Sequence, residues 1–377
     1  MNFNQFVSGR WVQQFEYRSF SPAPINLEWT WDDPQINTLM EGATQAIGEL
    51  NAFSLIVPDV DLFIQMHVAK EANTSSRIEG TQTDFDEAIR PVEFVRPERR
   101  DDWQEVQNYI QAMNQAIAAL ERLPLSNRLL NDTHAVLLQG VRGERKFPGD
   151  VRRSQNWIGG SGPSDAAFVP PHHDELPELM GDLEKFWHNE SIQVPHLIRI
   201  AISHYQFETI HPYCDGNGRI GRLLITLYLV SKGLLRKPTL YLSAFLEKNK
   251  GAYFDALTRV RESNDVGHWV RFFLTAVLET ARNGRTAFEG ILRIRQEVEQ
   301  ATLTLGKRAE NARHLLNRLY THPFVTPNEV ADLLQVTHQT ASTLIHDFER
   351  LGILEKSIKV ERSQIYVFRK YFDLFLN

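Results

Sequence analysis

The sequence predicts a mostly α-helical protein that carries a smaller α+β unit at its C-terminal end. Apolar residues recur at helical spacing along most of the chain between residues 36 and 320, and the stripe formed by Val106, Ile110 and Met113 is one example. Near the C-terminus, residues 355–370 alternate between polar and apolar side chains, which is typical of two short strands. The 377 residues are enough for two or three domains.

The composition excludes several classes of protein. The net charge of −6 gives no overall basic character for nucleic acid, and the one cysteine excludes an internal disulfide framework and a thiolate metal cluster. No apolar run approaches the ~20 residues of a membrane span, and the start "MNFNQFVSGRW" lacks the basic and apolar regions of a secretory signal. We therefore expect a cytoplasmic protein with no membrane association.

The N-terminal region begins without a helical pattern. Residues 1–35 are rich in aromatic residues and proline, and we expect an extended arm that lies across another part of the fold. Helical spacing follows as far as residue 72. In the string "SSRIEG" that comes next, Ser75 and Ser76 suit helix caps and Gly80 suits a helix stop. Taken alone, this string indicates a short helix with a solvated Glu79.

The middle of the chain alternates between helical patterns and one long turn-rich stretch. Gly and Pro argue against helix between residues 142 and 177, where "RRSQNWIGG" leaves room for a short surface hairpin with a Gly-Gly end. The helices that we expect around this stretch cover 103–122, 125–141, 178–189, 196–210, 219–235 and about 250–320.

The last part of the chain has the element order of a winged helix. Thr326 can cap a helix and Pro327 suits its first turn. Two short helices and a two-strand wing follow. A DNA-binding regulator is therefore an alternative function, with Gln339, Thr340 and Ser342 as the side chains that would reach base edges. Residues 326–377 hold six Lys/Arg and seven Asp/Glu, so their net charge of −1 does not favour DNA, and dimerisation or recruitment of a target is the preferred role.

The stretch "HPYCDGNGRIGR", residues 211–222, is the strongest functional signal. Pro212 disfavours continuation of the preceding helix, and Asp-Gly-Asn-Gly is a turn signature. A helix then begins at Arg219. A loop that enters a helix N-terminus presents unpaired amides and the positive end of the helix dipole, which is an anion site.

The side chains of this stretch suit transfer from a nucleoside triphosphate. Arg219 and Arg222 offer two guanidinium groups for phosphate, Asp215 suits Mg2+, and a neutral His211 can accept a proton from a hydroxyl. If only His211 and Asp215 are considered, an ordinary polar junction between two helices is an alternative interpretation. A zinc site is not supported, because His211 and Asp215 have no third ligand nearby. A Walker A phosphate-binding loop is excluded, because the sequence contains no G-x-x-x-x-G-K-[ST].

The same stretch resembles the Fic-domain signature H-P-[FY]-x-[DE]-G-N-G-R-x-x-R at every defined position. Residues 148–160 and "FVPPHHDEL" resemble the family's flap and the segment after it, and "SSRIEG" is similar to the inhibitory motif [ST]-x-x-x-E-[GN]. The resemblance implies an all-helical Fic core with a short β-hairpin flap. We divide the chain into an N-terminal arm and inhibitory segment (1–100), a Fic catalytic domain (101–300) and a winged helix (301–377).

The resemblance also implies roles for individual residues. His211 would be the base and Asp215 the Mg2+ ligand, while Tyr253, which alone would be read as a core aromatic, would contact the adenine. The remaining nucleotide-binding residues would be Gly216, Asn217, Gly218, Arg219, Gly221 and Arg222, with Asn217 at the α-phosphate. The residues of the flap that would dock the target are Ser154, Gln155, Asn156, Trp157 and Ile158.

The activity that the resemblance implies is AMPylation. Members with this motif move AMP from ATP to a Ser, Thr or Tyr hydroxyl of a protein, themselves included, with Mg2+ and release of pyrophosphate. Glu79, with Ser75 and Gly80, would inhibit this reaction by reaching Arg222 in place of the γ-phosphate. Hydrolytic removal of AMP by the same site is an alternative, and a homodimer is expected from relatives of this layout.

Overall fold

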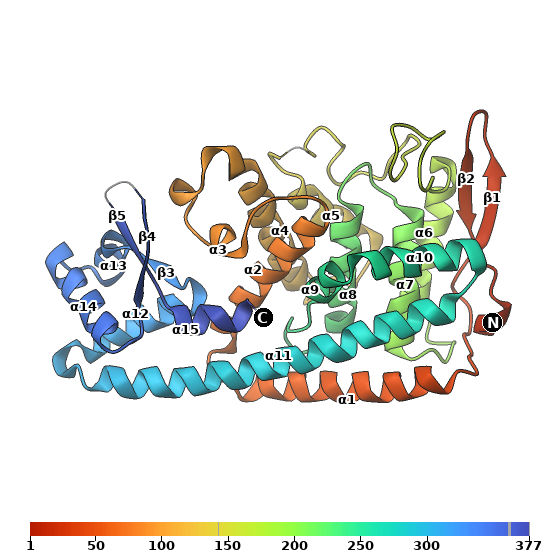
Figure 1. Ribbon diagram of the computed structural model, residues 1–377. Helices are drawn as coiled ribbons and strands as arrows, with labels where there is room; N and C mark the ends of the chain where they lie inside the picture. The colour runs from red at the N-terminus through yellow and green to blue at the C-terminus, as the bar shows by residue number, and fades with distance from the viewer. Residues whose placement is uncertain (142, 361–362, 377) are drawn as a thin grey trace.

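A computed structural model describes residues 1–141, 143–360 and 363–376 as an elongated, mostly helical molecule (Figure 1). The mostly α prediction is confirmed. The helices are α1 (Pro34–Ile56), α2 (Val60–Ile78), α3 (Phe85–Ala88), α4 (Arg100–Ala119), α5 (Asn127–Leu137), α6 (Leu176–His188), α7 (His196–Ile210), α8 (Asn217–Ser231), α9 (Ser243–Lys248), α10 (Lys250–Ser263), α11 (Val266–Leu303), α12 (Ala309–Thr321), α13 (Pro327–Leu334), α14 (His338–Arg350) and α15 (Arg369–Phe372). The strands are β1 (Gly9–Gln13), β2 (Arg18–Pro22), β3 (Phe324–Val325), β4 (Glu355–Val360) and β5 (Ser363–Val367).

Two buried helices and one long helix organise the core. α7 and α8 lie side by side, and nearly all of their residues are buried. α11 has 38 residues and runs beside α1 along the base of the molecule toward the C-terminal part (Figure 1). Among the described residues, no helix is both long and apolar enough to cross a bilayer.

The N-terminal arm is not extended throughout. It contains the antiparallel hairpin β1–β2, which is joined to the chain after the flap by a hydrogen bond from Phe20 N to Val169 O of 2.9 Å. The rest of the arm is fixed to α6 and α7. Asp182 accepts a hydrogen bond from Ile25 N, and Gln206 donates to Ala23 O. The arm therefore lies across another part of the fold, as expected.

The helical pattern after residue 36 forms two helices, and the second extends further than expected. α2 continues to Ile78, so Ser75 and Ser76 lie in its last turn and are fully buried. The expectation that they cap a helix is wrong, because the packing of this face of α2 against the core outweighs the local preference of serine for caps. Gly80 has a φ of +106° just beyond the helix, the conformation in which glycine is favoured.

The flap region contains less β-structure than the short hairpin that the sequence predicts. Its pairing consists of one antiparallel bridge between Ile158 and Phe168, with N···O distances of 2.8 and 3.2 Å. Gly159 and Gly160 both have positive φ and turn the chain after the bridge. The return segment is followed at once by Pro170 and Pro171, which lack the N–H donors that would extend the ladder.

The C-terminal part combines α12, α13 and α14 with the sheet β3–β5–β4. Thr326 and Glu329 form a reciprocal capping box at the start of α13. The predicted wing corresponds to β4 and β5, although residues 361–362 of the predicted stretch lie outside the described residues. The rings of Tyr320 and Tyr371 lie 4.9 and 6.2 Å from that of Phe63, so this part of the chain packs directly on α2.

Candidate functional site

The loop between α7 and α8 enters a helix N-terminus, where main-chain amides are left without intrahelical partners. His211 ends α7 with a φ of +50°, and Gly216 precedes α8 with a φ of +77°. The first hydrogen bond into α8 runs from Ile220 N to Gly216 O, at 3.0 Å. The amides of residues 217–219 therefore make no hydrogen bond within α8, and they lie at the positive end of its helix dipole.

The side chain of Asn217 holds this loop closed. Its Oδ1 accepts a hydrogen bond from Tyr213 N, and its Nδ2 donates to Tyr213 O, both at 2.8 Å. We expected Asn217 to contact an α-phosphate. Because Tyr213 uses the oxygen and one N–H of this side-chain amide, the second N–H of Nδ2 and the main-chain N–H remain for that contact in this conformation.

Arg222 is buried and is held by Ser75, in the last turn of α2, and by Glu79, the residue that follows this helix. Its Nε donates to Ser75 Oγ at 2.8 Å, and one terminal nitrogen donates to Ser75 O at 2.9 Å and to Glu79 Oε1 at 2.7 Å. Burial alone would lower the pKa of Arg222, but the charge of Glu79 raises it above its usual value. Burial would likewise raise the pKa of Glu79, and Arg222 lowers it, so both groups are charged.

The carboxylate of Glu79 also lies against the first turn of α8. A Cβ atom at Gly218 would clash with Glu79 Oε1, so glycine is required for this approach. The Glu79 side chain is 41% exposed, whereas that of Arg222 is 2% exposed. Glu79 thus occupies the accessible side of the anion site, where a phosphate group would approach.

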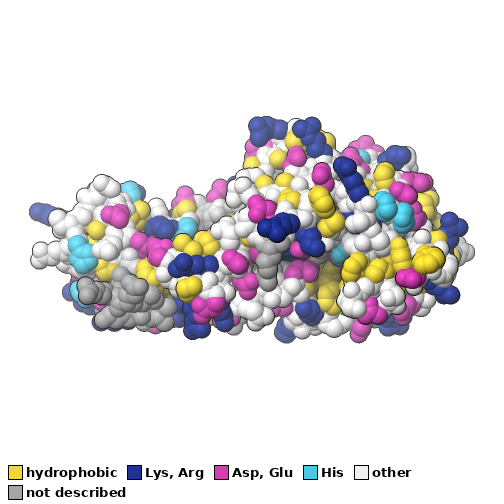
Figure 2. Space-filling model, turned by 90° about the horizontal axis from the view of Figure 1, so that it is seen from above, with side chains coloured by type: hydrophobic (Ala, Val, Ile, Leu, Met, Phe, Trp, Pro, Cys, Tyr) yellow, Lys and Arg dark blue, Asp and Glu magenta, His cyan; other side chains and the backbone are white. Residues whose placement is uncertain are grey.

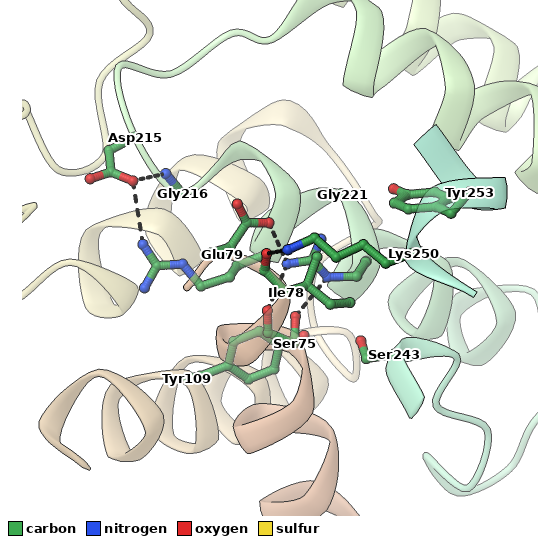
Figure 3. Close-up of polar contacts among 12 residues, drawn as sticks. Ser75, Ile78, Glu79, Tyr109, Asp215, Gly216, Gly221, Ser243, Lys250 and Tyr253 are labelled. Carbon is green, nitrogen blue, oxygen red and sulfur yellow. Dashed lines mark hydrogen bonds and ion pairs between the residues drawn. The ribbon is translucent and has the colours of Figure 1, made fainter. Parts of the chain in front are cut away.

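The end of α2 is tied to α9 and α10 by contacts that the sequence did not indicate. Lys250 Nζ donates to Ile78 O at 2.6 Å, next to Glu79 (Figure 3), and Arg77 forms a 3.0 Å ion pair with Glu247. No motif or spacing distinguishes Lys250 from the other lysines of the chain, so only the fold identifies it.

Arg219 and Asp215 form a second charged pair on the same loop. The buried guanidinium of Arg219 lies 3.3 Å from Glu105 and 3.4 Å from Asp215 Oδ1. Asp215 Oδ1 also accepts from Gly216 N at 2.6 Å, and its side chain is 42% exposed. One accessible carboxylate beside a phosphate site fits Mg2+, which takes few protein ligands and completes its shell with phosphate oxygens and water.

The ring of His211 is held in its neutral form. Burial lowers its pKa to about 4, although the negative charge of Glu79 opposes part of that shift. A neutral imidazole can accept a proton at pH 7. The main-chain carbonyl of His211 accepts from Arg152 Nε at 3.0 Å and from Asn156 Nδ2 at 3.2 Å, so residues of the flap fix its backbone.

The predicted flap residues lie against this loop in different ways. Asn156 also donates to Tyr213 O, Gln155 donates to Pro170 O, and Ser154 O accepts from Arg152. Trp157 is 41% exposed, and Ile158 forms the bridge to Phe168. Sequence reasoning missed Arg152, because nothing in the string "VRRSQ" separates it from the neighbouring arginine.

Two predicted nucleotide contacts face the core instead. Tyr253 is 1% exposed, and its hydroxyl lies 2.8 Å from His204 Nε2. Gly221 packs on Glu208, whose Oε1 leaves no room for a Cβ, and its carbonyl lies 2.8 Å from His204 Nδ1. In this structure neither residue faces the loop, because Tyr253 is buried in the core and the face of α8 that carries Gly221 packs against Glu208 of α7. Their contacts with a nucleotide stay predictions.

Glu208 is a buried acid that the sequence reasoning also missed. It lies one turn before His211, and its Oε1 has no hydrogen-bond partner among the residues that the structure describes. Burial raises its pKa to about 7, and the charge of Arg222 opposes that shift. A carboxyl group in this setting is largely protonated below neutral pH.

Two family models match parts of this chain, and the second match includes the loop between α7 and α8. Residues 37–118 match the model described as Fic/DOC family N-terminal, and residues 124–229 match the Fic/DOC family model. "Protein adenylyltransferase Fic" of Aedes aegypti is 32% identical over 126 residues, 33% of this chain and 22% of that protein. The protein of the same name from Drosophila erecta is 29% identical over 133 residues, 35% of this chain and 24% of that protein. This chain thus spans less than a quarter of either relative.

A solved structure shares the overall fold. The Fic family protein from Desulfovibrio desulfuricans aligns with a TM-score of 0.54, covering 89% of this chain and 96% of that chain. The identity over this alignment is 20%, so the likeness concerns the arrangement of the elements.

Proposed function

From the Fic domain that this chain carries at residues 124–229, with its N-terminal segment at 37–118, we propose that the protein is a protein adenylyltransferase. It moves AMP from ATP to a Ser, Thr or Tyr hydroxyl of a protein, itself included. The names of the relatives support a transferase. The observation that carries the proposal is the open amide end of α8, with Arg219, Arg222 and neutral His211 around it.

The proposed reaction is a substitution at the α-phosphorus of ATP. The hydroxyl oxygen of the target forms a bond to the α-phosphorus, and the bond from that phosphorus to the bridging oxygen of the leaving group breaks. His211 accepts the hydroxyl proton, and pyrophosphate leaves with the electron pair of the broken bond. The amides of residues 217–219 stabilise the charge on the α-phosphate, and the two arginines bind the leaving phosphates.

Asp215 is the residue that would hold Mg2+, which when bound supplies positive charge to the phosphates of the nucleotide. The pairing of Asp215 with Arg219 orients the carboxylate from the protein side. The flap is the segment that would align the target hydroxyl with His211, since Arg152 and Asn156 fix it to the same loop.

Glu79 is proposed to restrain this activity. It holds Arg222 and covers the start of α8, so ATP must compete with an internal carboxylate for the same guanidinium. A charge-assisted pair in a partly closed site contributes roughly 2–3 kcal/mol. Competition of that size weakens productive nucleotide binding on the order of 10- to 100-fold.

Intact mass spectrometry tests the proposal. Wild type and Glu79→Gly are incubated with Mg2+ and ATP, CTP, GTP or UTP in separate reactions. A gain of one AMP with ATP, larger in the variant, is the expected result. A phosphoryl gain would contradict adenylyl transfer. No gain with any nucleotide in either protein would contradict transfer to itself, and the test is then repeated with an added protein target as the acceptor.

The reverse reaction is measured in the same experiment. Modified Glu79→Gly is separated from ATP and mixed with unmodified wild type. Loss of AMP only when wild type is present would assign hydrolytic removal to the form in which Glu79 is intact.

A further inference from the structure

We propose that His134 is a positioning residue. It keeps the loop that carries Asp215 at a fixed position relative to the start of the flap. His134 lies on α5, and its side chain is fully buried. Its Nδ1 accepts a hydrogen bond from Gly149 N at 2.9 Å, and its Nε2 lies 3.0 Å from Asp215 O. One imidazole therefore joins two segments that are 66 residues apart, the difference between positions 149 and 215.

The two partners determine the protonation of the ring. Gly149 N–H can only donate, so Nδ1 must offer its lone pair. The carbonyl of Asp215 can only accept, so Nε2 must carry the proton. The neutral Nε2–H tautomer is the one form of histidine that satisfies both contacts, and no other neutral side chain has an acceptor and a donor at these two positions.

Further contacts of the ring fix its plane. His134 stacks on Tyr213, with ring centroids 3.9 Å apart and an interplanar angle of 11°. The hydroxyl of Tyr213 donates to Asn131, one turn earlier on α5. α5 thus holds the loop at both Tyr213 and Asp215.

The two hydrogen bonds act on different parts of the proposed reaction. The bond to Asp215 O orients the backbone that carries the proposed Mg2+ ligand. The bond to Gly149, which has a φ of +84°, fixes the entry to the flap, three residues before the Arg152 that contacts the His211 carbonyl. The hydrogen bonds of His134 go to the backbone of Asp215 and Gly149, so its role is exerted through these neighbours.

Two substitutions separate the two bonds. Asn at position 134 places an oxygen where Nδ1 lies but is too short to reach Asp215, so His134→Asn keeps the flap bond. Gln places an N–H where Nε2 lies, so His134→Gln keeps the loop bond and loses the flap bond. His188→Asn is the control, because it removes a bond from another histidine ring to Leu125 O, before α5 begins, and leaves both bonds of His134 in place.

Hydrogen exchange of the free proteins is the first readout and needs no ligand. In His134→Asn we expect amides of residues 213–219 to exchange about 3- to 10-fold faster, with 147–153 unchanged; in His134→Gln we expect the opposite pattern. The control should leave both segments unchanged. Equal loosening of both segments in both variants, or no change in either, would overturn the proposal and leave His134 as a residue that fills space in the core.

The second readout rests on the proposed function. In the Glu79→Gly background, the Mg2+ concentration for half-maximal ATP binding should rise about 3- to 10-fold in His134→Asn and stay within about twofold in His134→Gln. The same rise in both variants would overturn the assignment of the Asp215 bond. If wild type and every variant fail to bind ATP, the proposed function is contradicted. The role of His134 is then still decided by the hydrogen-exchange rates of residues 147–153 and 213–219, which are measured without ligand.

Discussion

The carboxylate of Glu79 and the guanidinium of Arg222 lie 2.7 Å apart although 143 residues separate them in the sequence. The contact joins the end of α2 to the first turns of α8. The same α2 packs through Phe63 on rings of the C-terminal part. The residue that covers the anion site is therefore carried by a helix that is anchored at both ends.

Glu79→Gly should raise AMP transfer about 10- to 100-fold at limiting ATP, because Arg222 is then available to phosphate. Glu79→Gln should have an intermediate effect, since it keeps an acceptor oxygen and loses the charge. The measurement is the initial rate with labelled ATP. Glu93→Gly, at an exposed position, is the control and should match wild type. Equal rates for Glu79→Gly and wild type would remove Glu79 from the regulation of the site.

His211→Ala should lower transfer by about 10²- to 10⁴-fold, the range for loss of a general base. ATP binding, measured by calorimetry in the Glu79→Gly background, should change by less than about threefold, because the amides of α8 and both arginines are retained. Loss of binding together with transfer would mean that His211 supports the structure of the loop and is not the base.

Tyr253→Phe should destabilise the protein by about 1 kcal/mol, because it removes the hydrogen bond to His204 in the core. The KM for ATP should stay within about twofold of wild type, since the ring is 1% exposed. Thermal unfolding and steady-state kinetics give the two values. A raised KM at unchanged stability would restore the adenine contact that the sequence resemblance implied.

Glu208 should make stability fall as pH rises. Burial raises its pKa to about 7 from the usual value near 4.5, so the folded state holds a proton that the unfolded state loses. Its contribution is complete below about pH 4.5 and is lost as pH rises through 7. Compared with wild type, Glu208→Gln should therefore gain up to about 3 kcal/mol in unfolding free energy between pH 4.5 and 8.

Urea unfolding of both proteins at several pH values measures this difference. Glu93→Gln serves as the exposed control and should run parallel to wild type. A difference between wild type and Glu208→Gln that does not change with pH would show that Glu208 is ionised in the folded protein.

The C-terminal part should not bind DNA at moderate salt. In the first turns of α14 Gln339, Thr340 and Thr343 are exposed and uncharged, and Arg350 is exposed at the end of the helix. Residues 326–377 together have a net charge of −1. On the face in Figure 2, basic and acidic side chains are interspersed rather than gathered into one basic region. A gel shift at low and moderate salt tests this. A complex that survives moderate salt would favour the regulator alternative.

The chemistry of the site could be read from the sequence because it lies in one short string. His211, Asp215 and the two arginines occupy one loop and one helix turn, so local rules for turns and helix N-termini already place them together. The mostly α class was also predictable, since it depends on the spacing of apolar residues along each helix.

The sequence could not decide which face of each helix packs against which neighbouring element. Ser75 looked like a cap and is a buried acceptor for Arg222, while Gly221 and Tyr253 looked like ligand contacts and face the core. His134 carried no motif at all, yet it joins the loop to the flap.

The sequence by itself therefore determined the helical class and the chemical groups of the 211–222 loop, because both follow from interactions between residues close in the chain. The tertiary structure decided which distant groups complete that loop. Glu79, Arg152 and His134 reach it through contacts between segments far apart in sequence, and Lys250 holds the end of α2 beside Glu79. Those contacts exist only once the apolar faces of the helices have been buried against one another.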